Sequence, residues 1–173
     1  MIREVLTYPN PKLRTISQDV TSFDENLHAL LDDLYETMLH KNGVGLAAIQ
    51  VGVALNVLVI NPVNEDGEQK KEDLLEVINP QIVESEGVII FQEGCLSVPS
   101  VYEDIERFKK IKVKFFDRFS VEHTEVYEDF MAVALQHEID HLRGHIFIER
   151  LSYLKRKKFE KEWKKQLKEK AAV

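Results

Sequence analysis

Residues 129–144, DFMAVALQHEIDHLRG, form the stretch of sequence on which the fold is centred. One helical face of this stretch would carry Phe130, Val133, Ala134, His137 and His141. These residues recur three or four positions apart, which is the period of an amphipathic α-helix. Gly144 follows, where a helix can end in a left-handed residue without steric cost. The stretch therefore predicts a helix whose apolar face also presents two histidines.

The pattern His137-Glu138-Ile139-Asp140-His141 predicts a metal site on this helix. Four residues make slightly more than one turn, so both imidazoles can reach one ion at about 2.0–2.1 Å. Glu138 is rotated by about 100° from His137 and can face a water in the open coordination position, as a general base. The alternative is that both histidines only pack in the core, where each would need its own hydrogen-bond partner. We expect a metal-dependent hydrolase.

The third ligand has several candidates. One class of metallopeptidases has a third histidine ten residues after the first, and Phe147 stands there, which excludes that class. Glu160 and Glu162 lie in a highly charged terminal segment where a fixed ligand is not expected. Cys95, at the end of an apolar run, is the better candidate because a thiolate neutralises part of the charge of a divalent ion. A free cysteine can also be a small buried residue without such a role.

A glycine-bracketed segment, residues 43–52 (GVGLAAIQVG), predicts a second part of the site. Gly45 would let an extended substrate bind to the main chain. Gln50 could donate its amide to a developing oxyanion. A tight turn followed by an ordinary buried segment remains the alternative.

The rest of the sequence predicts an α+β fold. A capping box at residues 22–25, Ser22 to Glu25, precedes a helix that ends at Asn42 and Gly43. Apolar runs at residues 57–60, 75–78, 81–91, 110–116 and 121–127 predict antiparallel strands. Phe159, Trp163 and Leu167 predict a terminal surface helix. We expect antiparallel β-sheets packed around the central metal-binding helix, with residues 1–150 catalytic and 151–173 a basic helix of the same domain.

Composition and charge limit the class of protein. The chain has 173 residues, 44% of them hydrophobic, and a single cysteine, which fits one globular domain in a reducing compartment. No apolar run reaches about twenty residues, and Glu4 and Pro9 interrupt any signal-peptide pattern, so we expect a cytoplasmic protein. Residues 155–170 carry nine Lys or Arg against three Glu, a net charge of +6 in a chain of −7. This tail fits a solvated helix face or a polyanion contact.

Three separated motifs together resemble those of the peptide deformylases of bacterial type. They are Gly43-Val44-Gly45-Leu46-Ala47-Ala48-Ile49-Gln50, Glu93-Gly94-Cys95-Leu96-Ser97 and Gln136-His137-Glu138-Ile139-Asp140-His141. The resemblance follows their order and approximate spacing over most of the chain. It implies removal of the N-formyl group from the N-terminal formylmethionine of newly made polypeptides, with release of formate.

The resemblance also implies roles for individual residues. Cys95, His137 and His141 correspond to the metal ligands, and Glu138 corresponds to the catalytic acid and base. Gln50 and the backbone N–H of Leu96 correspond to the oxyanion site. The family resemblance implies Fe²⁺ as the native ion, with Zn²⁺, Ni²⁺ or Co²⁺ able to replace it.

The motifs and the family resemblance also predict how the peptide is bound. An apolar pocket for the methionine side chain is expected among residues near the motifs, although some of them would only pack in the core. The expected substrate-binding residues are Val44, Gly45, Phe91, Glu93, Gly94, Phe130, Val133 and Ala134. Many family members carry an arginine shortly after the second motif, near the place where this chain has Tyr102. Contacts to the distal peptide backbone are therefore expected to differ.

The sequence also suggests binding partners and leaves two alternative functions open. We expect a monomer that acts on nascent polypeptides, with the basic terminal helix near the ribosomal exit tunnel. One alternative is a structural metal site with His145 as fourth ligand, which would leave Glu138 and Gln50 without a role. Another is a protein whose main role is RNA binding through the terminal helix.

Overall fold

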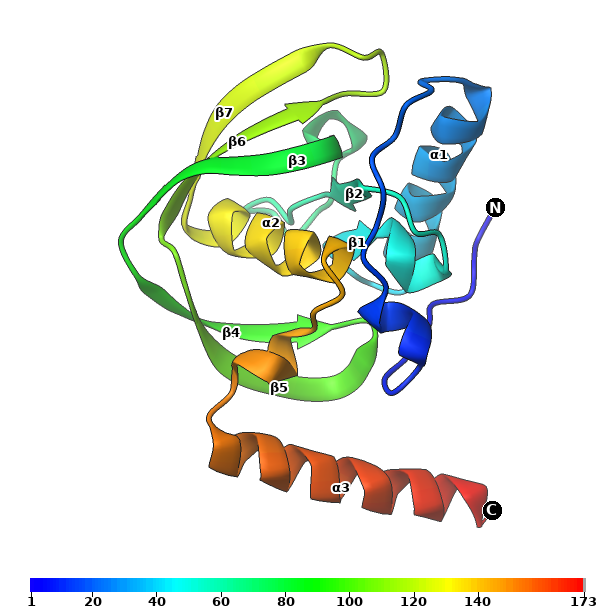
Figure 1. Cartoon of the computed structure of the whole chain (residues 1–173), viewed down its shortest axis with the longest axis vertical. Coiled ribbons are helices and arrows are strands. Elements are labelled where there is room, and N and C mark those ends of the chain that lie inside the picture. Colours follow the sequence, from blue (N-terminus) through cyan, green and yellow to red (C-terminus); the bar gives the residue numbers. More distant parts are fainter. Residues whose placement is uncertain (173) are drawn as a thin grey trace.

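The computed structural model describes residues 1–172, and its elements surround one buried helix (Figure 1). The helices are α1 (Glu25–His40), α2 (Asp129–Leu142) and α3 (Tyr153–Ala171). The strands are β1 (Gly45–Ala47), β2 (Val57–Ile60), β3 (Leu75–Glu86), β4 (Ile89–Cys95), β5 (Val98–Arg107), β6 (Lys110–Phe116) and β7 (Glu122–Glu128). The α+β prediction is confirmed, with α2 as the central helix and α3 at the surface.

The strands form two antiparallel sheets on different sides of α2. One sheet has five strands in the order β1-β2-β3-β6-β7, and the other is the β4–β5 hairpin. Figure 1 shows β3, β6 and β7 on one side of α2 and the hairpin on the other. Among residues 1–172, β1 and β4 each pair with a neighbour along one edge only. Two strand edges near α2 are therefore free to receive another chain.

The strand predictions were right in place and partly wrong in extent. Residues 81–91 were expected to form one strand, but Gly87, with a φ of 70°, ends β3 and redirects the chain into β4. The strand β3 continues through Asn79 and Pro80, although proline has no N–H to donate. This is possible because the pairing of β3 with β6 is irregular between Ile78 and Gln81. No strand was expected between residues 91 and 110, but Val98–Arg107 form β5. The short strand β1 was missed altogether.

Helix α1 begins two residues later than the predicted capping box. Asp24, not Ser22, is the N-cap, and its side chain accepts from the backbone N–H of Leu27. The predicted end is confirmed, since Asn42 takes a φ of 57° directly after the helix. The buried apolar residues of α1 are Leu27, Leu30, Leu31, Leu34 and Met38. They pack on β2 and orient the segment that follows the helix.

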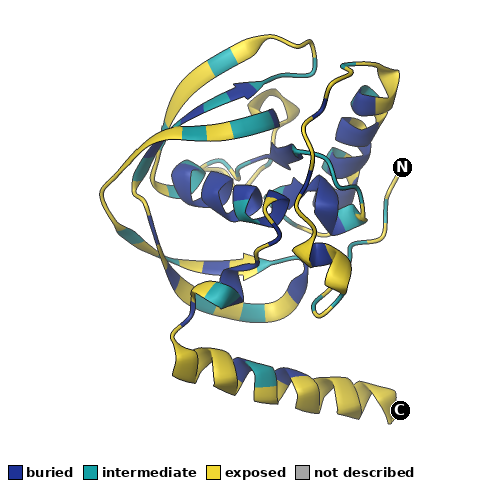
Figure 2. Ribbon diagram, in the orientation of Figure 1, coloured by how far each residue is buried: buried dark blue, intermediate teal, exposed yellow. Residues whose placement is uncertain are grey.

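Helix α2 is fixed by the sheet beneath it. Its residues Ala132, Leu135 and Ile139 lie in one apolar cluster with Val77 of β3 and Val113 of β6. Figure 2 shows α2 almost wholly in the colour of buried residues. Truncating a buried Leu or Ile to Ala typically costs about 2–5 kcal/mol, so rotation of α2 on the sheet is strongly disfavoured. The histidines of α2 therefore have a defined direction.

Helix α3 is held to the body by a small aromatic contact. Phe159 and Trp163 are buried against Tyr8, with ring centroids 5.6 and 5.9 Å from the Tyr8 ring. Leu167, expected in the same stripe, is 42% exposed. Figure 2 shows most of α3 as exposed.

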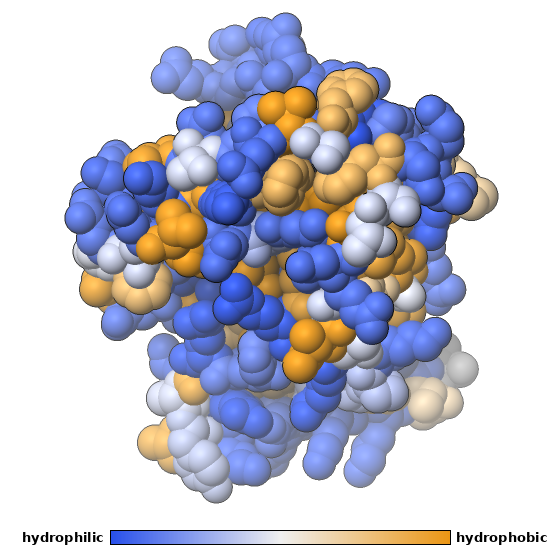
Figure 3. Space-filling view, turned by 45° about the horizontal axis from the view of Figure 1, so that its top comes forward, coloured by the Kyte–Doolittle hydropathy of each residue, from blue (hydrophilic) through white to orange (hydrophobic). Residues whose placement is uncertain are grey.

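No helix within residues 1–172 combines the length and the apolar character needed to cross a bilayer. On the face drawn in Figure 3, hydrophobic residues lie in patches among hydrophilic ones.

Candidate metal centre and active site

Three side chains from β4 and α2 form a compact, largely buried cluster. The ligand atoms of Cys95, His137 and His141 all lie within 4.8 Å of one another. The Nε2 of His141 lies 3.3 Å from the Sγ of Cys95 and 3.3 Å from the Nε2 of His137. Among residues 1–172, this is the one group of three or more His, Cys, Asp or Glu with such spacing. The structure thus brings together the three residues expected to bind a metal.

The separations within the cluster fit a divalent ion. Ligand atoms about 2.1 Å from a tetrahedral ion are about 3.4 Å apart, close to the two distances of 3.3 Å. One sulfur and two imidazole nitrogens suit iron, zinc, nickel or cobalt. The Oε2 of Glu138, beside the cluster, is buried without a partner among the described residues. The donor set, its spacing and this unsatisfied carboxylate oxygen are consistent with a metal centre and a water bound to it.

His137 is oriented by a carboxylate. Its Nδ1 lies 2.8 Å from the Oε1 of Glu93, so the Nε2 is directed toward the cluster. A carboxylate that accepts from the far nitrogen of a ligating histidine fixes its tautomer and strengthens it as a donor. Burial alone would lower the pKa of His137, but its hydrogen bond to Cys95 and the Glu93 carboxylate raise it well above the usual range. Burial and the neighbouring His137 charge lower the pKa of His141.

A buried arginine holds this carboxylate in place. Arg107, at the end of β5, binds both oxygens of Glu93 and also donates to Asp140 of α2 at 2.9 Å. Asp140 in turn accepts two bonds from Arg150 at 2.8 and 3.0 Å. The Arg107 side chain is fully buried. Burial acts to raise the pKa of Glu93 and of Asp140, but the contacts with arginine outweigh it and lower both pKa values. The network therefore carries ionised carboxylates at neutral pH.

Glu138 stands beside the cluster without belonging to it. Its Oε1 lies 4.0 Å from the Nε2 of His137. Gly45 of β1 lies directly against the carboxylate, because a Cβ at that position would stand 2.8 Å from Oε1. Burial raises the pKa of Glu138 to about 7, against the lowering effect of His137. A carboxyl group with such a pKa can both accept and donate a proton near neutrality.

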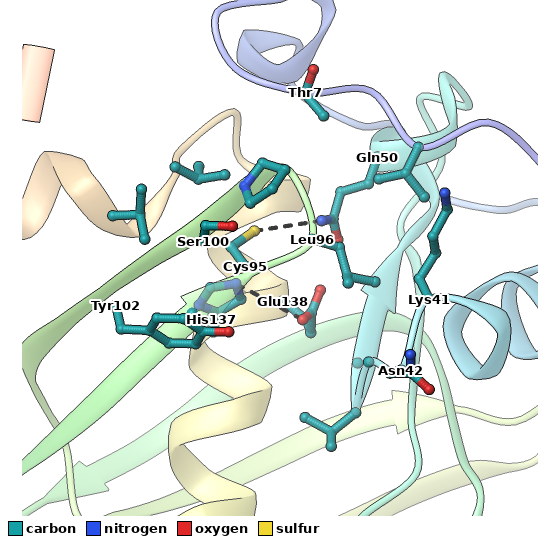
Figure 4. Close-up of a pocket in the computed structure, with 18 residues that line it drawn as sticks. Thr7, Lys41, Asn42, Gln50, Cys95, Leu96, Ser100, Tyr102, His137 and Glu138 are labelled. Carbon is teal, nitrogen blue, oxygen red and sulfur yellow. Dashed lines mark hydrogen bonds and ion pairs between the residues drawn. The ribbon is translucent and has the colours of Figure 1, made fainter. Parts of the chain in front are cut away.

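Gln50 reaches the cluster from the other wall. It lies on the short 3₁₀ turn Ala48–Val51, and its Oε1 accepts the backbone N–H of Ala47 at 2.9 Å. That bond directs the Nε2 toward the Oγ of Ser97 at 3.1 Å and the Sγ of Cys95 at 3.6 Å. The amide therefore presents its donor side to the cluster, as Figure 4 shows. This is the orientation that oxyanion binding requires.

An open cavity of about 600 Å³ borders these groups (Figure 4). His137, Glu138, Cys95 and Gln50 line its inner part. The outer walls include Thr7, Lys41, Asn42, Leu96, Ser100 and Tyr102. A cleft of this size can hold several residues of an extended peptide. It lies between the β1 and β4 segments, whose edges are free.

A second, smaller cavity of about 150 Å³ adjoins the same inner groups. His137 and Glu138 line both cavities. All of the residues expected to bind the substrate line the smaller one, namely Val44, Gly45, Phe91, Glu93, Gly94, Phe130, Val133 and Ala134. The rings of Phe91 and Phe130 stand 5.9 Å apart across it. Its size and apolar walls suit one side chain.

Other candidate ligands lie elsewhere. The exposed His145 pairs with Glu149 at 2.8 Å and does not join the cluster. Phe147 is a buried core residue whose ring packs near His137. Glu160 pairs with Arg156 and Lys157 within α3. Cys95, His137 and His141 are therefore the three candidate ligands among the described residues, and a tetrahedral ion held by them would keep one position for water or substrate.

Sequence reasoning missed the residues that support the site. Arg107 had no local signal, because its partners are 14 and 33 positions away. Gln69 was also missed, although its Nε2 donates to the carbonyls of Gly43 and Asn61 at 3.0 and 2.7 Å. It thereby fixes the loop before β1. Ser97 lay inside a quoted motif, and its contact with Gln50 appears only in three dimensions.

Comparison with known proteins identifies the family. The chain matches the model for polypeptide deformylase over residues 2–157. A peptide deformylase from Nautilia profundicola is 56% identical over 169 residues, which cover 98% of this chain and 97% of that protein. The crystal structure of a peptide deformylase from Legionella pneumophila superposes with a TM-score of 0.89 at 40% identity, over 100% of this chain and 99% of that one.

A further solved structure carries a peptide. It is the Met-Ala-Ser-bound class I type b peptide deformylase from Acinetobacter baumannii, with a TM-score of 0.81 and 31% identity, over 87% of this chain and 99% of that one. The motifs, the Cys/His/His cluster and these similarities agree. This chain belongs to the peptide deformylase family.

Proposed function

We propose that this chain removes the N-formyl group from the N-terminal formylmethionine of newly made polypeptides, releasing formate and a free amine. Family membership supports the reaction. The observation that carries the proposal is the Cys95, His137 and His141 cluster, with the Glu138 carboxylate 4.0 Å from His137. A metal site with three protein ligands and an adjacent carboxyl group is suited to amide hydrolysis by water.

Cys95, His137 and His141 would hold the metal, and Fe²⁺ is the proposed native ion, as the family resemblance implies. When bound, such an ion polarises the formyl oxygen and lowers the pKa of a water molecule. Zn²⁺, Ni²⁺ and Co²⁺ suit the same donors. Anaerobic purification followed by elemental analysis tests the assignment. Stoichiometric zinc with no iron would overturn it.

Glu138 would carry protons through the reaction. Its carboxylate accepts a proton from the attacking water and later delivers it to the amine nitrogen as the carbon–nitrogen bond breaks. Gly45 contributes by having no side chain, since a Cβ there would stand 2.8 Å from the carboxylate and displace it.

Gln50 and the backbone N–H of Leu96 would stabilise the negative charge that develops on the formyl oxygen. The Oε1 of Gln50 is held by the Ala47 N–H at 2.9 Å, so the Nε2 is already oriented before the substrate binds. Such preorganised donors need no rearrangement at the moment of reaction. Ser97 supports the same orientation by its contact with the Nε2.

The free edges of β1 and β4 would bind the peptide backbone. Both cavities lie between these strands, and Gly45 and Gly94 line both cavities, one on each strand. An extended peptide adds to exposed strand edges by main-chain hydrogen bonds. The methionine side chain would enter the small cavity, whose apolar walls suit a flexible thioether. The rest of the peptide would occupy the larger cavity.

The test is formate release from formyl-Met-Ala-Ser by metal-loaded protein. Glu138→Gln keeps the size of the side chain but cannot exchange a proton, so we expect turnover to fall about 10²–10⁴-fold. Metal content, measured by elemental analysis, should stay at one ion per chain. A structural metal site would instead give no formate from either protein. Equal turnover by both proteins would remove Glu138 from the mechanism.

Further proposals concern the context of the enzyme. We propose that it acts as a monomer in the cytoplasm and that residues 151–173 belong to the same domain as residues 1–150. The buried Phe159 and Trp163 support a single unit. A mass near 20.1 kDa by sedimentation equilibrium would support the monomer, and a dimer mass would exclude it.

We also propose that the basic α3 docks near the ribosomal exit tunnel. The net charge of +6 over residues 155–170 supports this proposal.

A further inference from the structure

A third cavity, of about 330 Å³, lies between β5 and α3. Its walls include Tyr102, Lys155, Lys158, Phe159, Glu162 and Trp163. The reaction described above does not use this groove. Figure 1 shows α3 running beside the β4–β5 hairpin, so the groove lies on the same side of the protein as the hairpin.

The groove adjoins the catalytic cavity, because the two share wall residues. Ser100, Val101 and Tyr102, at the start of β5, line both of them. Tyr102 is 66% exposed, and its ring covers Gly94, where a Cβ would stand 2.7 Å from the nearest ring carbon. One residue thus forms the rim of the catalytic cavity and a wall of the groove. A chain that leaves the catalytic cavity over Tyr102 would enter the groove directly.

The chemistry of the groove suits a polar, extended chain. Its base is formed by Phe159 and Trp163, which are mostly buried. Lys155, Lys158 and Glu162 stand above this base on one face of α3. None of these three charged side chains forms an ion pair within the described part of the chain, so each is available to a ligand. Long side chains with unpaired charges can bind peptide side chains and carbonyl groups.

We propose that this groove binds the part of the substrate polypeptide downstream of the residues in the catalytic cavity. The proposal rests on the proposed function, since it extends the same substrate site. A newly made polypeptide continues well beyond its first residues, and in this proposal its next segment passes over the rim formed by Tyr102. Lys155 and Lys158 would bind acidic side chains of this segment. Glu103 and Glu162, which also line the groove, would bind basic ones. Helix α3 would then have an inner face for substrate and an outer face for other partners.

The two faces of α3 provide a matched control. Lys161 and Lys164 lie on the same helix but do not line the groove, because a rotation of about 100° per residue directs them away. Removing either lysine pair changes the net charge of the protein equally. Lys155→Ala with Lys158→Ala therefore tests the groove, and Lys161→Ala with Lys164→Ala tests the general charge of the helix.

The experiment compares a short and a long substrate. Formyl-Met-Ala-Ser is the short one, and the long one adds six polar residues that include two glutamates. We expect KM to be about two- to tenfold lower for the long substrate, as two exposed ion pairs would give. The Lys155 and Lys158 pair of substitutions should remove this difference, and the Lys161 and Lys164 pair should leave it. Turnover of the short substrate should be the same in all three proteins.

A second readout does not depend on turnover. Trp163 is the single tryptophan of the chain and lines the groove. Titration of the metal-loaded protein with the deformylated long peptide should change its fluorescence, and deformylated Met-Ala-Ser should not. Equal KM values for the two substrates would overturn the groove proposal, as would equal effects of the two lysine pairs. If the short substrate were not turned over at all, the proposed function itself would fail.

Discussion

Helices α2 and α3 are attached to the protein in opposite ways, and this difference separates chemistry from contact. Ten of the 14 residues of α2 are buried, against two of the 19 residues of α3. The polar side chains of α2 bind residues of other elements, as His137 binds Glu93 and Asp140 binds Arg107. The ion pairs of α3 lie within the helix itself. Changes near α2 should therefore affect the reaction strongly, and changes on α3 should affect only what the helix touches.

The largest effect after that of Glu138 is expected at Gln50, which faces α2 across the cluster. Gln50→Ala removes a preorganised donor, and the loss of one such donor typically lowers kcat by about 10²–10³-fold. Steady-state kinetics with formyl-Met-Ala-Ser measure this effect. Gln50→Glu is the matched control, because it keeps the size of the side chain but replaces the donor nitrogen with oxygen. If Gln50→Ala kept nearly full turnover, the oxyanion role would have to be abandoned.

Arg107 tests whether the orientation of α2 side chains depends on the buried network. Arg107→Leu leaves Glu93 and Asp140 without their buried counter-ion, so we expect the free energy of unfolding to fall by about 3–5 kcal/mol. We also expect metal affinity to fall about 10–100-fold, because Glu93 would no longer be held against His137. Urea unfolding and competition with a chelator measure the two quantities.

Two controls accompany the Arg107 test. Arg107→Lys keeps the charge but not the two-point contact, and it should recover part of both losses. Arg150→Leu removes the exposed partner of Asp140, and an exposed pair contributes only about 0–1 kcal/mol. Unchanged metal affinity in Arg107→Leu would show that the network stabilises the fold without orienting the ligand.

A substitution at Val133, also on α2, tests whether the small cavity binds the methionine side chain. Val133→Phe would fill much of the 150 Å³ next to Glu138, so we expect KM for formyl-Met-Ala-Ser to rise about tenfold or more. A substrate that begins with formyl-glycine needs no side-chain pocket, and its KM should change little. Packing strain of about 1–3 kcal/mol is expected in both measurements and does not distinguish the substrates. Equal changes in KM would mean that methionine binds elsewhere.

The same contrast explains how much of the site could be read from the sequence. His137, Glu138 and His141 share one helix, so their relative positions follow from the helical period alone. Cys95 belongs to another element, and its place rested on the chemistry of thiolates and on the resemblance. The structure brings it to 3.3 Å from His141. Local periodicity thus gave the helix, and the family motifs gave the rest of the cluster.

The supporting residues could not be found in this way. Arg107 ends β5, a strand that the sequence prediction lacked. Pairing across a hairpin decides that segment, and such pairing depends on residues far along the chain. The same holds for Gln69, which is eight positions from Asn61 and 26 from Gly43. Long-range contacts of single polar residues leave no periodic signal in a sequence.

The smallest effect is expected on the outer face of α3, where the comparison predicts changes in contact without changes in chemistry. Replacing Lys161, Lys164 and Lys168 with alanine should weaken binding to ribosomes and lower the slope of log Kd against log salt by up to about three. Turnover of formyl-Met-Ala-Ser should stay the same, since none of these residues lines a cavity of the site. Lys110, Lys112 and Lys114 of β6 provide the control, because each is already paired with a glutamate. If both sets of substitutions weakened ribosome binding equally, general charge and not the face of α3 would be responsible.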